Sequence, residues 1–202
     1  MFRNHIDKIY GSGQLEMIIG PMFSGKTSRL LSEVSKRGIN RNVCIICHKF
    51  DTRSDKGIST HNKLFNNDFN FPIIIVEKLK DVDVSNFDFI AIDEAQFFSD
   101  LNIVFDWLDA GIDVFISSLD ADYDRNIIGH YHELIPRSRK LEKLCAYCYE
   151  CAKEGNPNSL APHSFKIGGS SSKIFEVGDI DMYVALCEKH WNEFYFNKYN
   201  HE

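Results

Sequence analysis

The stretch Gly20-Pro-Met-Phe-Ser-Gly-Lys-Thr27 decides the fold of this chain. It fits the pattern G-x-x-x-x-G-K-[ST], in which glycines let backbone N–H groups turn towards bound phosphates. An apolar run, Leu15–Ile19, precedes this stretch, and an amphipathic segment, Thr27–Arg37, follows it. A strand before the pattern and a helix after it favour a phosphate-binding loop over a tight glycine turn with a solvated lysine.

The loop, residues 20–27, has a distinct role for each polar side chain. Its lysine, Lys26, is expected to reach the β- and γ-phosphates of ATP, and the Thr27 hydroxyl is expected to hold Mg²⁺. We expect the whole loop to line the nucleotide site: Gly20, Pro21, Met22, Phe23, Ser24, Gly25, Lys26 and Thr27.

Outward from the loop, short apolar runs alternate with amphipathic segments as far as about Ser118. Five runs predict buried strands: Leu15–Ile19, Val43–Cys47, Ile73–Val76, Phe87–Ile92 and Asp113–Ser117. Thr27–Arg37 and Leu101–Ala110 have helical spacing. The pattern predicts an α/β fold of the P-loop, RecA-like kind, with a mostly parallel sheet covered by helices on both faces.

A second motif, which is acidic, follows one of the predicted strands. Phe87–Ile92 is followed by Asp93 and Glu94, an arrangement in which Asp93 holds Mg²⁺ and Glu94 removes a proton from an attacking hydroxyl. Two solvated acids that open a turn are the alternative. Next come Phe97 and Phe98, which are either core residues or, for one of them, a surface on which a flat base stacks.

The pattern changes after about Lys143, where cysteines and Gly/Ser/Asn/Pro clusters replace regular periodicity. Cys148-x-x-Cys151 and Cys187-x-x-His190 form two chelating pairs with the spacing of a structural Zn²⁺ site. Cys145 also forms a CxxC pair with Cys148, so the spacing alone leaves two choices. We therefore expect a P-loop α/β domain over residues 1–143 and a zinc-binding domain with a C-terminal tail over 144–202.

Composition limits the partners of the chain. It has 202 residues and a net charge of -6, which disfavours nucleic acid or an anionic membrane as the main partner. We see no export signal and no apolar run of about 18 residues, so we expect a cytoplasmic protein. The basic segment 137–143 is interpreted as a solvated helix face.

The motifs together resemble one family, the zinc-containing P-loop thymidine kinases, from about Gly13 to His190. They occur in the family's order: GPMFSGKT (20–27), DTR (51–53), TH (60–61), IDEAQFF (92–98), SLDADY (118–123), KLCAYCYEC (143–151) and VGDIDMY (177–183). The resemblance implies transfer of the γ-phosphate of ATP to the 5′-hydroxyl of thymidine, which gives thymidine monophosphate. It also implies a homotetramer and feedback inhibition by thymidine triphosphate.

The resemblance also assigns roles to single residues. Glu94 becomes the catalytic base, and Arg53 lies near the transferred phosphate, although a solvated loop cation is its alternative. Asp51, Asp93 and Gln96 join the nucleotide site. A lasso loop, approximately Ile174–Gly178, holds the thymine edge through its backbone. The implied thymidine contacts are Met22, Phe97, Leu119, Tyr123, Ile174, Phe175, Glu176, Val177, Gly178 and Tyr183.

The family pattern places threonine where Cys145 stands, which selects Cys148 and Cys151 as zinc ligands beside Cys187 and His190. Three features depart from the pattern. Asp179 replaces a glycine, residues 152–162 look longer than usual, and Ser164-Phe-Lys166 is only the nearest match to a T/S-x-R motif.

Two other functional classes compete with the kinase. One is an ATPase or switch whose zinc lobe binds a partner or nucleic acid, although such an enzyme has no need of the aromatic pair after the acids. The other is a catalytically silent regulator, against which the intact Lys26, Thr27, Asp93 and Glu94 argue.

Overall fold

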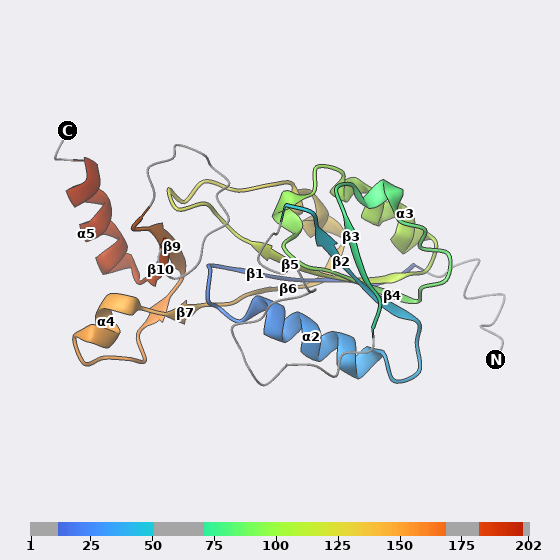
Figure 1. The fold of residues 1–202 in the computed structure, drawn as a ribbon, viewed down its shortest axis with the longest axis horizontal. Coiled ribbons are helices and arrows are strands. Elements are labelled where there is room, and N and C mark those ends of the chain that lie inside the picture. The colour runs from blue at the N-terminus through green and yellow to red at the C-terminus, as the bar shows by residue number, and fades with distance from the viewer. Residues whose placement is uncertain (1–11, 51–70, 169–181, 200–202) are drawn as a thin grey trace. The chain divides into compact units, whose positions relative to one another are not determined.

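The computed structural model describes residues 12–50, 71–168 and 182–199. Its main sheet has six strands in the order β3-β2-β4-β5-β1-β6 (Figure 1). The strands are β1 Leu15–Gly20, β2 Val43–His48, β3 Ile73–Val76, β4 Phe89–Ile92, β5 Asp113–Leu119 and β6 Ser138–Lys143. β2 pairs in parallel with β3 and β4, and β4 with β5, so the expected parallel sheet is confirmed.

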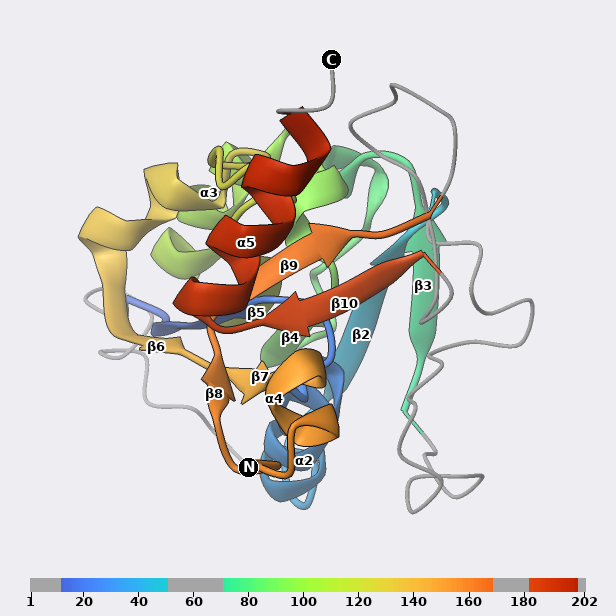
Figure 2. The same cartoon turned by 90° about the vertical axis from the view of Figure 1, so that its left-hand side faces the viewer.

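Helices lie on both faces of this sheet. α2, Lys26–Arg37, and α3, Val104–Asp109, lie on opposite sides of the strands (Figures 1 and 2). The described residues also contain short 3₁₀ turns: η2 Leu79–Asp81, η3 Ala95–Phe97, η4 Leu101–Ile103 and η5 Tyr131–Arg137. The predicted α/β fold of the P-loop class is therefore confirmed.

The sheet core explains why the sequence shows its central strands as continuous apolar runs. All four residues of β4 are fully buried, and Leu30 and Val34 of α2 are fully buried as well. Each of the larger side chains, Phe, Ile, Leu or Val, contributes about 1.5–3 kcal/mol by leaving water. Because both faces of a parallel sheet are covered, its inner strands carry apolar residues at every position instead of alternating.

The last strand of the sheet corrects one interpretation of the sequence. Residues 137–143, expected to present a helix face, instead finish η5 and form β6. β6 lies at the edge of the sheet, and Arg139, Lys140 and Lys143 are exposed. Charged side chains on an edge strand hinder pairing with other chains, so a basic segment is compatible with this position.

The described residues divide into two compact units. The first contains the chain up to Ile18, Thr27–Ser118 and Gly129–Glu142, and the second contains Ile19–Lys26, Leu119–Ile128 and the chain from Lys143 onward. The second unit holds β7 Ala146–Tyr147, α4 Tyr149–Lys153, β8 Leu160–Ala161, β9 His163–Lys166, β10 Tyr183–Leu186 and α5 Glu188–Tyr199 (Figure 2).

Two short antiparallel pairs build the second unit, β7 with β8 and β9 with β10. They share a small core with α4 and α5: Ala146, Cys148, Cys151, Ala161, Phe165, Val184, Ala185, Leu186 and Trp191. Two of these nine residues are cysteines, so two of the predicted metal ligands are also part of the packed core of this unit.

Candidate active site and metal centre

The phosphate-binding loop is held in shape by its own residues. Gly20 has a φ of 153°, and a Cβ there would lie 2.6 Å from the Leu144 carbonyl oxygen. The Ser24 hydroxyl and the Lys26 ammonium both donate to the Pro21 carbonyl, at 2.8 and 2.7 Å. Lys26 is buried, so its ammonium group is held at the loop and does not extend into solvent.

A second contact fixes the loop from β9. The backbone N–H of Met22 donates to the Ser164 hydroxyl at 3.0 Å. Two residues further along the same strand, the Lys166 ammonium lies 5.7 Å from the centre of the Tyr123 ring. Residues two apart on a strand share a face, so the Ser164-x-Lys166 segment presents both groups on one side. Neither residue was among the site residues predicted from the sequence.

Thr27 and Asp93 meet within the first unit. The Thr27 hydroxyl donates to Asp93 Oδ2 at 3.0 Å, and Asp93 is almost fully buried. A hydroxyl beside a carboxylate supplies the hard oxygen ligands that suit Mg²⁺. The two residues that the sequence assigned to one cation are therefore adjacent.

Glu94 follows Asp93 in an unusual backbone conformation. Its φ of 50° and ψ of 48° place it in the left-handed region. For any residue except glycine this conformation has a cost in free energy, and it persists mainly at functional sites. The carboxylate is buried and accepts a hydrogen bond of 2.5 Å from the Gln96 side-chain amide. Gln96 in turn accepts one of 3.1 Å from the Ser118 hydroxyl, at the end of β5. The chain of hydrogen bonds fixes the direction of the carboxylate.

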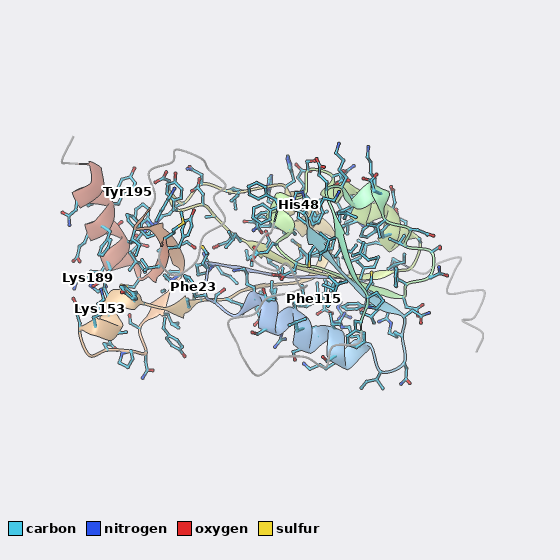
Figure 3. All side chains as sticks on the ribbon, viewed as in Figure 1. Phe23, His48, Phe115, Lys153, Lys189 and Tyr195 are labelled. Atoms are coloured by element: carbon cyan, nitrogen blue, oxygen red, sulfur yellow. The ribbon has the colours of Figure 1, made fainter. Side chains whose placement is uncertain are left out.

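The aromatic pair after the acids divides into two roles. Phe98 is fully buried and belongs to the core, whereas Phe97 is only half-buried. His48, labelled at the end of β2 in Figure 3, contacts both rings, with centroids 5.9 Å from Phe97 and 4.8 Å from Phe98. Phe50 lies 5.4 Å from Phe97. No role is predicted for His48 or Phe50 from the sequence, since neither shows motif spacing.

Several predicted site residues lie outside the described residues. They are Asp51, Arg53, Ile174, Phe175, Glu176, Val177, Gly178 and the Asp179 substitution. Thr60 and His61 lie outside them as well. Of the remaining thymidine contacts, Leu119 is the last residue of β5 and Tyr123 lies in the loop that follows it. Tyr183 is buried on β10, opposite Lys166.

The four predicted metal ligands come together in the second unit. The Nδ1 atom of His190 lies 3.4 Å from the sulfur atoms of Cys148 and Cys151 and 3.5 Å from that of Cys187. The sulfur atoms of Cys151 and Cys187 are 3.8 Å apart. Cys145 is not part of this group, so the geometry agrees with the choice of Cys148 and Cys151.

These distances fit a tetrahedral zinc site. With Zn–S bonds of about 2.3 Å and a Zn–N bond of about 2.0 Å, two sulfurs lie about 3.8 Å apart and a sulfur and a nitrogen about 3.5 Å apart. The cluster could therefore hold Zn²⁺ with four protein ligands. The far nitrogen of the ring, Nε2, lies 3.3 Å from Glu154 Oε1, the kind of carboxylate contact that orients a metal-binding imidazole.

The electrostatics of the cluster favour metal binding. Burial alone would raise the pKa of the Cys148 thiol, but hydrogen bonds from the Cys151 and Cys187 backbone and from the His190 ring lower that pKa to about 6. A thiolate is the form that binds a metal. By contrast, burial raises the pKa of Cys44 to about 12, as expected for a core thiol on β2.

The geometry of the site defines a class of protein. A strand, a phosphate-binding loop and a helix, with buried acids at the end of a second parallel strand, define a P-loop nucleotide-binding enzyme. A family model described as thymidine kinase matches residues 13–191. The chain belongs to the thymidine kinase family, and the expectations of a phosphotransferase and of a thymidine kinase are confirmed at that level.

Curated relatives support this assignment over nearly their full length. The thymidine kinase of Variola virus (isolate Human/India/Ind3/1967) is 35% identical over 181 residues, which cover 88% of this chain and 96% of the relative. The thymidine kinase of Amsacta moorei entomopoxvirus is 32% identical over 189 residues, which cover 90% and 99%. None of the helices in the described residues has both the length and the apolar composition that a membrane span requires.

Proposed function

We propose that this chain transfers the γ-phosphate of ATP to the 5′-hydroxyl of thymidine, with Glu94 as the general base. The observation that carries the proposal is the buried Glu94 carboxylate, fixed by Gln96 and Ser118 and directly after the Asp93 that bonds Thr27. The 5′-oxygen attacks the γ-phosphorus and loses its proton to Glu94. The bond from that phosphorus to the oxygen bridging the β- and γ-phosphates breaks, and ADP leaves.

The nucleotide-binding residues have complementary tasks in this proposal. Lys26 and backbone N–H groups of the phosphate-binding loop bind the phosphates, and Thr27 and Asp93 hold Mg²⁺, which neutralises phosphate charge when bound. Asp51 and Arg53 act near the transferred group, where a guanidinium offsets the charge of the three equatorial oxygens.

Thymidine binds, in this proposal, through apolar and backbone groups. The half-buried Phe97 offers a ring face to the thymine, together with Met22, Leu119, Tyr123 and Tyr183. The backbone of residues 174–178 pairs with the polar edge of the base. A base that leaves these backbone groups unpaired is rejected, because a buried polar group without a partner costs free energy.

The remaining proposals concern the protein as a whole. We infer that Zn²⁺ at Cys148, Cys151, Cys187 and His190 is structural, since four protein ligands leave no open position for a substrate. We also propose a cytoplasmic homotetramer with feedback inhibition by thymidine triphosphate, no nucleic-acid partner, and a domain division near residue 143. Light scattering on the purified chain tests the tetramer.

ATP consumption tests the reaction directly. The purified chain with Mg²⁺ is offered each of the four deoxynucleosides in turn and then none. We expect turnover with thymidine, and deoxyuridine in a further sample to be a weaker acceptor. Equal ATP hydrolysis in all samples, including the one without nucleoside, would indicate an ATPase and contradict the proposal.

Glu94→Gln tests the base. We expect kcat to fall by about 10²–10⁴-fold, because the amide cannot accept the hydroxyl proton, while both substrates still bind in calorimetry. Glu133→Gln is the matched control, an exposed carboxylate on η5 paired only with His130 in the described residues. Near-normal kcat for Glu94→Gln would eliminate Glu94 as the base.

A further inference from the structure

The loop that follows Leu119 and carries Tyr123 contains a tight turn with one strained residue. Asp122 closes the turn by accepting hydrogen bonds from the backbone N–H groups of Asp124 and Asn126, at 2.9 and 2.8 Å. Arg125, inside the turn, has a φ of 68°. A residue other than glycine stays in this left-handed backbone conformation only where its surroundings hold it there.

The Arg125 side chain supplies that hold. Its Nη1 atom donates to Glu188 Oε1 at 2.9 Å, and its guanidinium carbon lies 3.6 Å from the centre of the Trp191 ring. Nε and Nη2 are buried and find no hydrogen-bond partner among the described residues. The position of the guanidinium therefore depends on two contacts, one ion pair and one stacked ring.

Both partners belong to α5 and stand beside metal ligands in the sequence. Glu188 follows Cys187, and Trp191 follows His190. Each partner is itself supported. His163 of β9 lies 2.7 Å from Glu188 Oε2, and the Tyr195 ring, labelled on α5 in Figure 3, stacks on Trp191 at 4.7 Å and 17°. The first turn of α5 is thus a rigid platform for Arg125.

We propose that Arg125 is a positioning residue for nucleoside binding, which fixes the 120–128 loop, and with it Tyr123, on the zinc-bearing end of α5. The proposal rests on the proposed function, because it takes Tyr123 to contact the thymine base. It gives the zinc site a task in substrate recognition. Metal at Cys187 and His190 sets the start of α5, Glu188 and Trp191 hold Arg125, and Arg125 sets the loop.

The chemistry of the contact explains why arginine occupies this position. A planar guanidinium can stack on an indole and donate to a carboxylate at the same time, whereas an ammonium is a compact point charge that does only the second well. Replacement by lysine therefore separates the ion pair from the stacking.

The test compares Arg125→Ala and Arg125→Lys with Arg137→Ala in the zinc-loaded enzyme. Arg137 is a matched control, with an ion pair to Asp109 at 2.6 Å and a ring contact to Phe105 at 5.3 Å. For Arg125→Ala we expect KM for thymidine to rise roughly tenfold, while KM for ATP stays within about twofold. Arg125→Lys is expected to lie between wild type and Arg125→Ala, and Arg137→Ala to match wild type.

A double-mutant cycle tests the path through α5. If Glu188 acts through Arg125, Glu188→Gln raises KM for thymidine, and Arg125→Ala/Glu188→Gln is no worse than Arg125→Ala alone. The zinc content of every variant is measured and is expected to equal that of wild type.

Two outcomes overturn the role of Arg125: an unchanged KM for thymidine and an equal rise in both KM values. Additive effects in the cycle overturn the path from α5 through Glu188. The proposed function is judged separately, by wild-type turnover of thymidine in the same assay. Absence of wild-type turnover contradicts that function, whereas normal wild-type turnover with an unaltered Arg125→Ala enzyme contradicts only the positioning role.

Discussion

Single contacts between distant residues organise the catalytic acids. The 3.0 Å hydrogen bond between Thr27 and Asp93 spans 66 positions of sequence. The two hydrogen bonds that link Ser118 to Gln96 and Gln96 to Glu94 connect the end of β5 with the end of β4. Parallel strands end at the same edge of a sheet, so polar residues that follow different strands meet there. The motifs identify the acids, but the sheet supplies their partners.

Gly129 supports Gln96 and offers a test at this scale. Its φ is 69°, and a Cβ would lie 2.6 Å from the Gln96 carbonyl oxygen. We expect Gly129→Ala to destabilise the protein by about 3 kcal/mol, since left-handed strain and overpacking add, and to lower kcat by moving Gln96. Urea unfolding and steady-state kinetics measure the two effects.

Gly155→Ala is the control for backbone strain alone. Gly155 has a φ of 85°, but nothing lies within 4 Å of an added Cβ. The expected cost is about 1 kcal/mol, with kcat unchanged. Equal losses of stability in the two variants, or an unaffected kcat in Gly129→Ala, would show that contact with Gln96 does not matter.

Secondary-structure elements differ in how clearly the sequence shows them. β2, β4 and β5 are buried strands, and their apolar runs predicted them to within about two residues. β6 was missed, because an edge strand needs little apolar surface and the segment carries mostly charged residues. Its place beside β1 depends on contacts that no local pattern contains, among them the ion pair of Arg139 with Glu16.

The junction of α4 and α5 gives a prediction about elements. Glu154, directly after α4, contacts His190 of α5 through Nε2 of the ring, and Figure 3 labels Lys153 and Lys189 on the same two helices. We expect Glu154→Ala to weaken Zn²⁺ binding by about 10-fold or more, because the imidazole loses the carboxylate that orients it. Competition with a chromogenic chelator measures the affinity.

Glu150→Ala is the matched change on the same helix. Glu150 pairs with Lys153 at 2.9 Å and makes no contact with His190. Its zinc affinity is expected to equal that of wild type. If Glu154→Ala also binds zinc like wild type, the 3.3 Å contact has no role in holding the ring.

At the scale of the whole molecule, we propose that the second unit depends on Zn²⁺ for its core. Three of the four ligands, Cys148, Cys151 and His190, are buried, and the short strand pairs around them offer little apolar area. Metal binding supplies the folding free energy that such a lobe lacks. Residues 19–26, which include most of the phosphate-binding loop, belong to the same unit. Loss of order in this unit is therefore expected to weaken the binding of both ATP and thymidine.

Removal of zinc tests this dependence. A zinc-selective chelator, with Mg²⁺ in excess, is expected to lower Tm by about 5–10 °C and to abolish thymidine turnover. Calorimetry and the kinase assay follow the two quantities, and added Zn²⁺ should restore both. A zinc-free chain with the same Tm and the same activity would contradict a structural metal.

The sequence by itself determined the phosphate-binding loop, the acids after the fourth strand, the parallel sheet and the paired ligands, because each depends on residue types within a short stretch. Glycine conformation, apolar runs and ligand spacing are local properties. Only the tertiary structure excluded Cys145 from the metal cluster by geometry and buried Phe98 while leaving Phe97 half-exposed. It also brought Ser164 to Met22 and Arg125 to Trp191. These contacts join residues far apart in the chain, and strand order and packing decide which of them form.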